Sequence, residues 1–246
     1  MNNKALKVLI TAVQFLIAFA LAYLCAEGIL KAELYQDRMK FVGCLLRILS
    51  ILAFTICYYH SLTSGFGVDS LFVPLHLFFS ILSEIRILYK YSTVFYVHYL
   101  APVQIVDIFI LSVFMNVLPL IGYCIFFDNV GSSGVGRFIS VSFVGSVLMT
   151  ILLPKAQNFS DLFRFKVFYF LIYIIYVVAA LVCIISLITD TPGQTVVRHI
   201  ILLLLLTSSY INLFYDTFIL NIIGTAFIIT VTFIVIVMSR RNAIKL

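Results

Sequence analysis

The stretch "VFYFLIYIIYVVAALVCIISLIT", residues 167–189, contains no charged side chain and is long enough to cross a bilayer as one helix. A membrane-spanning helix needs about 20 mostly apolar residues. Similar apolar runs recur along the whole chain of 246 residues, of which 63% are hydrophobic and 11% charged. Soluble proteins are about half apolar and about a quarter charged. The sequence therefore predicts an integral membrane protein with an all-α fold, a polytopic transmembrane helix bundle.

We expect about eight membrane-spanning helices in a single integral membrane domain, residues 1–246. No polar portion of the chain is long enough to fold as a separate domain. Seven spans are the alternative, in which one apolar segment near the C-terminus does not cross the membrane. The eight predicted spans are 6–29, 41–62, 70–89, 104–127, 138–153, 167–189, 196–214 and 217–238.

The basic residues bear on orientation, because Lys and Arg are enriched in cytoplasmic loops. Eight spans divide them almost evenly between the two sides, whereas seven spans gather most of them inside. We expect loops 30–40, 86–91 and 154–166 to be cytoplasmic and the protein to lie in the cell membrane, either plasma or cytoplasmic. The net charge of +6 is then explained by contact with anionic lipid, and we expect no nucleic-acid partner.

The third predicted span holds the most informative polar residues. An ionisable group in hydrocarbon costs at least about 2.5 kcal/mol, so each one there needs a partner, a cavity or a route to the interface. At 100° per residue, five polar side chains fall on one face about 100° wide, and the opposite face is apolar. We call this face the polar seam: Asp69, His76, Ser80, Ser83 and Glu84.

Arg86 points away from the polar seam, and we interpret it as a separate interfacial anchor. Two interpretations of the seam stay open. In one, His76 and Glu84 exchange protons or bind a substrate along a polar path. In the other, the carboxylates lie at headgroup depth and His76 holds a neighbouring helix by a hydrogen bond. The tyrosine-rich stretch 89–102 is expected to lie along the membrane surface before the fourth span.

Polar residues of other spans are candidate partners of the seam. Arg47 and Asn116 lie deep enough to need partners, and an ion pair of Arg47 with Glu84 or with Asp107 would supply one. Pro119, inside the fourth span, predicts a kink that frees a carbonyl near Asn116.

The sequence offers little for metal or catalytic chemistry. His60, Asp69 and His76 flank one short predicted loop and are candidate metal ligands, although short polar loops often hold such residues without a metal. The four histidines show no HExxH spacing, and the five cysteines never approach a CxxC spacing. We interpret the cysteines as small core or lipid-facing residues and expect no cofactor.

Three function classes remain. The leading one is a transporter, permease-like or channel-like protein that uses the polar seam. The alternative is a sensor, anchor or assembly subunit that works by helix contacts, with a membrane-protein partner or a second copy of the chain beside it in the lipid bilayer. A membrane-embedded enzyme acting on lipid substrates is the second alternative. The sequence does not decide whether the chain is an enzyme, but the lack of a catalytic motif favours a non-enzyme.

Overall fold

The computed structural model describes residues 3–62, 71–96, 99–125, 133–153, 166–189, 194–213 and 218–243. Nearly all of these residues are helical and none of them lies in a strand, as the sequence predicts. A 3₁₀ turn, Ser83–Ile85, joins α3 to α4. The α-helices are α1 (Asn3–Lys31), α2 (Tyr35–Leu62), α3 (Phe72–Leu82), α4 (Arg86–Phe95), α5 (Pro102–Ile125), α6 (Ser133–Leu152), α8 (Lys166–Thr189), α9 (Gln194–Leu213) and α10 (Phe218–Ala243).

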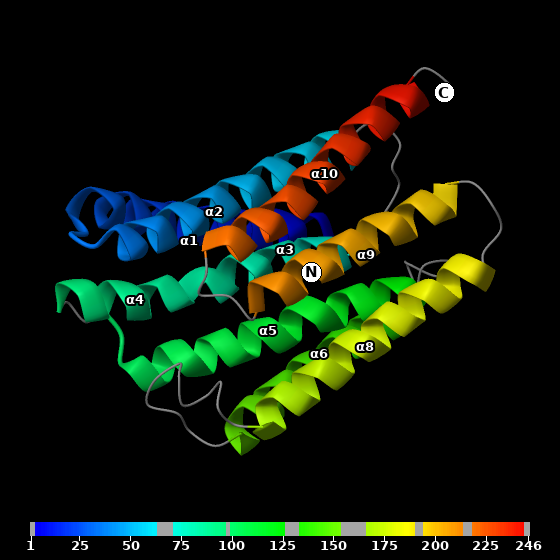
Figure 1. Cartoon of the computed structure of the whole chain (residues 1–246). Helices are drawn as coiled ribbons and strands as arrows, with labels where there is room; N and C mark the ends of the chain where they lie inside the picture. The colour runs from blue at the N-terminus through cyan, green and yellow to red at the C-terminus, as the bar shows by residue number, and fades with distance from the viewer. Residues whose placement is uncertain are drawn as a thin grey trace.

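The helices pack around two central rods. One rod is α3 continued through the 3₁₀ turn into α4, and the other is α5 (Figure 1). The first rod contacts α1, α2 and α5, and α5 also contacts α6, α8 and α9. On one side of the bundle α2 lies between α1 and α10, and α10 returns along α9. The two central rods are thus enclosed by helices from both ends of the chain.

Among the described residues, five helical segments, one of them α3 continued into α4, are long and apolar enough to cross a membrane, which indicates an integral membrane protein. Helices α6, α8 and α9 contribute shorter apolar stretches, so eight crossings stay a prediction. The five candidate spans are Ala5–Lys31, Tyr35–Tyr59, Phe72–Phe95, Pro102–Gly122 and Phe218–Val237.

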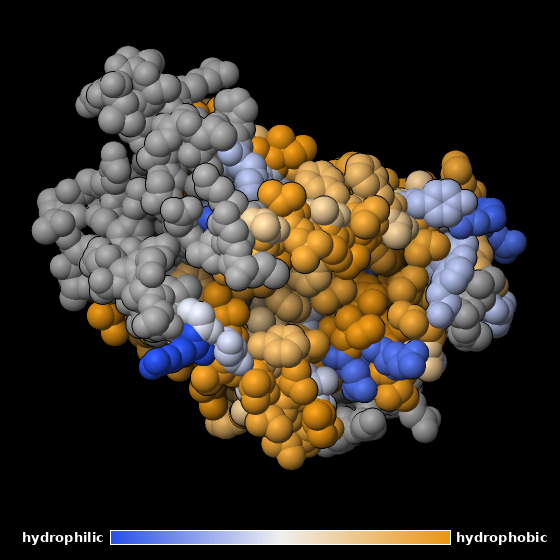
Figure 2. Space-filling model, turned by 180° about the vertical axis from the view of Figure 1, so that it is seen from behind, coloured by the Kyte–Doolittle hydropathy of each residue, from blue (hydrophilic) through white to orange (hydrophobic). Residues whose placement is uncertain are grey.

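The outer surface of the bundle is apolar. Leu16, Phe19 and Tyr23 of α1 are each more than 60% exposed, and Figure 2 shows hydrophobic residues over most of the described face, with hydrophilic ones toward its margins. In water such a surface would drive aggregation. In a bilayer it faces lipid tails, which are as apolar as the side chains themselves.

The connection between α1 and α2 is shorter than predicted. Only residues 32–34 separate the helices, where the sequence predicts a loop over 30–40. The Arg38 guanidinium donates a hydrogen bond to the carbonyl of Ala32 at 2.9 Å and so satisfies a group that the end of α1 leaves open. Asp37 lies in the first turn of α2, where its negative charge interacts favourably with the positive end of the helix dipole.

Two predictions for residues 86–102 are wrong. Residues 86–91 form no loop, and the tyrosine-rich stretch does not run along the surface from residue 89, because α4 continues to Phe95. Tyr91 is buried and meets the Phe41 ring of α2 edge-on, with ring centroids 6.4 Å apart. The helix ends at Tyr96, whose φ of 57° is left-handed and whose N–H donates to the carbonyl of Ser92. Aromatic packing against α2 therefore extends this helix beyond its apolar run.

Candidate functional site

An ion pair between α2 and the 3₁₀ turn lies at the centre of the candidate site. Arg47 Nε is 2.8 Å from Glu84 Oε1, and the two side chains are 2% and 0% exposed. A lone charge at this depth would be costly to bury, so the sequence predicts that Arg47 has a partner, and Glu84 is that partner. Asp107, the other candidate partner, is half-buried on α5, and within the described residues no ion pair joins it to Arg47.

The second carboxylate oxygen of Glu84 has partners of its own. Arg86 Nη2 lies 3.3 Å from Glu84 Oε2, and the thiol of Cys44 donates to the same oxygen at 3.5 Å. The prediction that Arg86 stands apart is therefore wrong. In a 3₁₀ turn, residues two apart are separated by about 120° around the axis rather than by about 160° as in an α-helix, and the long arginine side chain covers the remainder. We call Arg47, Glu84 and Arg86 the charge cluster.

The Arg47 head group also reaches the C-terminal helices. Its Nη1 donates a long hydrogen bond of 3.5 Å to Ser208 Oγ of α9. Ser208 in turn donates to the carbonyl of Gly224 on α10 at 2.8 Å. A Cβ at Gly224 would lie 2.9 Å from Arg47 Nη1, which is closer than a normal contact. The missing side chain at Gly224 thus provides the space for the guanidinium, and one arginine joins α2, α9, α10 and the 3₁₀ turn.

A neutral hydrogen-bond network connects α3 to α5 beside the charge cluster. His76 Nδ1 lies 2.8 Å from the backbone carbonyl of Asn116, and Asn116 Nδ2 donates to Ser80 Oγ at 2.7 Å. Pro119 has no N–H to offer the preceding turn, and the sequence predicts a free carbonyl in this region. The Asn116 carbonyl, which accepts the hydrogen bond from His76, lies in the turn that precedes Pro119. The Ser83 hydroxyl bonds locally, to the carbonyl of Ser80 at 2.7 Å.

The structure brings four residues of the polar seam together on the inward side of the α3–α4 rod. His76, Ser80, Ser83 and Glu84 are all buried, as one inward face requires. Asp69 and the side chain of His60 lie outside the described residues. The candidate metal site at His60, Asp69 and His76 therefore stays a prediction. Elsewhere in the described part of the chain, no group of three His, Cys, Asp or Glu side chains is placed to hold a metal ion.

Two small cavities border the charge cluster, and Arg47 and Ser209 line both. Each has about 10 Å³ of room for a water-sized sphere, which is the space of about one water molecule. The first cavity lies toward α5 and α8 and is also lined by Ser83, Phe109, Val113, Asn116 and Tyr176. The second lies toward α9 and α10 and is also lined by Ile51, Phe54, His76, Leu77, Ser80, Leu205, Ser208 and Ile228.

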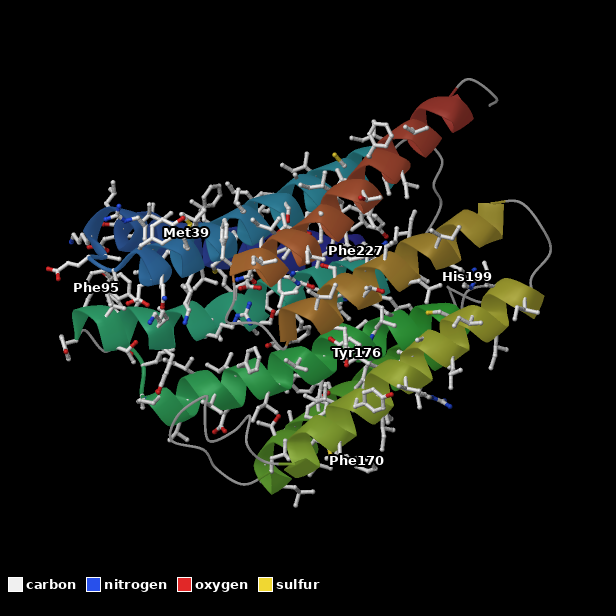
Figure 3. All side chains as sticks on the ribbon, in the orientation of Figure 1. Met39, Phe95, Phe170, Tyr176, His199 and Phe227 are labelled. Carbon is white, nitrogen blue, oxygen red and sulfur yellow. The ribbon has the colours of Figure 1, made fainter. Side chains whose placement is uncertain are left out.

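Several residues of this site give little signal in the sequence. Tyr176, labelled in Figure 3, lies on α8, the helix that contacts α5 and α9. Ser208 and Ser209 interrupt a leucine-rich run, and that interruption is the one local hint of a polar contact. Gly224 carries no side chain, and its role follows only from the distance to Arg47.

Comparison of the chain with protein-family models, with curated proteins and with solved structures finds no match.

Proposed function

We propose that the protein is a multi-pass membrane transport protein, permease-like or channel-like, whose path follows the polar seam past the charge cluster. The observation that carries the proposal is the charge cluster itself, in which Arg47 and Glu84 are buried at the centre of the bundle. Ionisable groups at membrane depth typically mark the path of an ion or substrate.

Helix cohesion alone does not require these charges. A buried ion pair is often no more stabilising than apolar side chains of the same volume, because desolvation of the ions offsets their attraction. The same bundle joins α1 to α2 by neutral groups: Gln14 Nε2 donates to Thr55 Oγ1 at 2.9 Å, and the hydroxyls of Thr11 and Tyr59 lie 2.5 Å apart. A charged contact at the centre is therefore better explained by a role in transport.

The two single-water cavities fit a closed state of such a path. A solute larger than water would need movement of the helices that close around Arg47. The α9–α10 hairpin is the candidate moving part, because it meets Arg47 through the Ser208 hydroxyl and the bare backbone of Gly224. Neither contact is a strong ionic bond. We also propose that this activity belongs to the cell membrane, where anionic lipid would face the basic loops.

The proposal is tested by reconstitution of the purified protein into liposomes. Uptake or current would be measured after jumps of protons, sodium, potassium, chloride, neutral amino acids and sugars. We expect flux of at least one of these solutes, and at least a tenfold loss of it in Glu84→Gln. Glu27→Gln is the matched control, since Glu27 pairs with Lys31 on α1, away from the cluster, and should keep the wild-type flux. Absence of flux for the whole panel would refute the transport function.

The alternative is an anchor or assembly subunit, and two observations favour it. The cavities take no more than about one water each, and α1 leaves an apolar face without a partner in the bundle. In this case the lipid bilayer, a second copy or another membrane protein covers α1. Crosslinking in native membranes through cysteines at Leu16 and Phe19 would capture that neighbour, and Glu84→Gln would leave the captured complex unchanged. In the described residues nothing specific favours an enzyme acting on lipid.

A further inference from the structure

We propose that the species moved along the polar seam is the proton, that His76 carries it, and that Arg47 is the gate that separates the two cavities. This inference rests on the proposed transport function and names the substrate of the same path.

The hydrogen bond of His76 determines where the ring takes up a proton. The carbonyl of Asn116 can only accept, so His76 Nδ1 must carry the hydrogen of the 2.8 Å bond. In the neutral ring, Nε2 is then the free acceptor. His76 lines the second cavity together with Arg47 and the hydroxyl of Ser208. A proton that arrives on water in this cavity therefore has one histidine nitrogen ready to receive it.

The transfer step balances without any further reactant. A hydronium ion in the second cavity gives one proton to His76 Nε2 and becomes water. Because Nδ1 stays bonded to Asn116, Nε2 returns this proton to water of the same cavity, and that water carries it toward the first cavity when the Arg47 guanidinium is displaced. The Nδ1–H bond to Asn116 is kept throughout. Arg47 and Glu84 exchange no proton in this step.

Arg47 separates the two cavities both physically and electrostatically. Its side chain lines each cavity, together with Ser209, so the guanidinium lies between the two spaces that water can occupy. A fixed arginine charge in a narrow pore is an electrostatic barrier to protons and other cations.

The groups that face His76 are consistent with this gate. Arg47 of α2 lines the second cavity together with His76, and α5 presents the backbone carbonyl of Asn116 to the His76 ring. With Arg47 in place the path is closed.

Gly224 offers a way to move the gate without removing a charge. An added Cβ would lie 2.9 Å from Arg47 Nη1, and the flexible end of the arginine must shift to make room. Gly224→Ala should therefore displace the guanidinium from the position between the cavities. Gly145→Ala on α6 is the matched control, because a Cβ there meets nothing within 4 Å.

The experiment measures proton flux into liposomes that contain full-length protein and an entrapped pH-sensitive dye, with a potassium gradient and valinomycin to set the voltage. We expect a slow wild-type rate, at least a fivefold faster initial rate in Gly224→Ala, and the wild-type rate in Gly145→Ala. Adding His76→Asn to Gly224→Ala should return the rate to the wild-type level. His199→Asn is the matched histidine control, since His199 is buried on α9 but is not among the residues that line either cavity.

Two results would overturn the inference: a wild-type proton rate in Gly224→Ala, or a fast rate that persists when His76→Asn is added. Should Gly224→Ala fail to fold, as judged by circular dichroism and gel filtration, Arg47→Gln decides instead, with the same faster rate expected. Flux of another solute without any proton flux would support the proposed transport function and refute the proton as its substrate. Absence of both fluxes would refute the two proposals together.

Discussion

Glu84→Gln tests how strongly the charge cluster is held. At an effective dielectric constant near 20, opposite unit charges at the 2.8 Å separation of Arg47 and Glu84 attract each other by about 6 kcal/mol. The contact with Arg86, at 3.3 Å, adds about 5 kcal/mol by the same reasoning. Desolvation of the three groups and repulsion between the arginines offset much of this attraction. The substitution leaves the buried Arg47 and the half-buried Arg86 without their counter-charge, and we expect a loss of about 3–5 kcal/mol in the free energy of unfolding.

The measurement is reversible unfolding in mixed micelles of lipid and sodium dodecyl sulfate, followed by circular dichroism. The double variant Arg47→Met with Glu84→Gln removes the inner cation as well and should recover most of the loss. Two neutral side chains of similar volume then fill the space of the ion pair. A Glu84→Gln protein within 0.5 kcal/mol of the wild type, or a double variant less stable than either single one, would refute this account of the cluster.

Three other stability predictions use the same unfolding assay. Gly28→Ala should lower the free energy of unfolding by about 1–3 kcal/mol, since a Cβ there would lie 2.6 Å from the Phe41 ring. Its control, Gly145→Ala, has open space around the added Cβ and should raise the free energy of unfolding by about 0.5–1 kcal/mol. Equal effects of the two substitutions would contradict the close contact of α1 with α2. Tyr96→Gly should stabilise by about 1 kcal/mol by removing left-handed strain at an exposed side chain, and a loss would argue against that conformation. Asn116→Ala should cost only about 1 kcal/mol, since the bond to His76 uses the retained backbone carbonyl.

The sequence was sufficient for the fold class and for the inward face of the third helix. Its polar residues repeat at helical spacing, and burial at membrane depth leaves few alternatives for charged side chains. Arg47 therefore could be assigned to a short set of partners, one of which, Glu84, is its partner in the structure. The general reason is energetic: hydrocarbon penalises an unpaired charge strongly enough that depth alone restricts where it can go.

Other features depended on contacts that no local pattern contains. The 3₁₀ turn is only three residues long, but it changes the angle between neighbouring side chains enough to bring Arg86 to Glu84, which an ideal α-helix would not do. The extension of α4 to Phe95 follows from packing of Tyr91 on Phe41, a pair distant in sequence. The approach of Gly224 to Arg47 likewise joins two helices that are distant in the chain.

The contact of Arg47 with Ser208 has a consequence for biosynthesis. The two residues are separated by 161 positions, and a ribosome adds about 5–20 residues per second, so about 10–30 s pass after synthesis of Arg47 before its α9 partner exists. During that interval the nascent α1–α2 hairpin carries the Arg47 cation, which gains its partner Glu84 when the third helix is synthesised. Release of α2 from the insertion machinery should therefore wait for the third helix, and Glu84→Gln should prolong the time that nascent chains remain crosslinkable to the translocation channel.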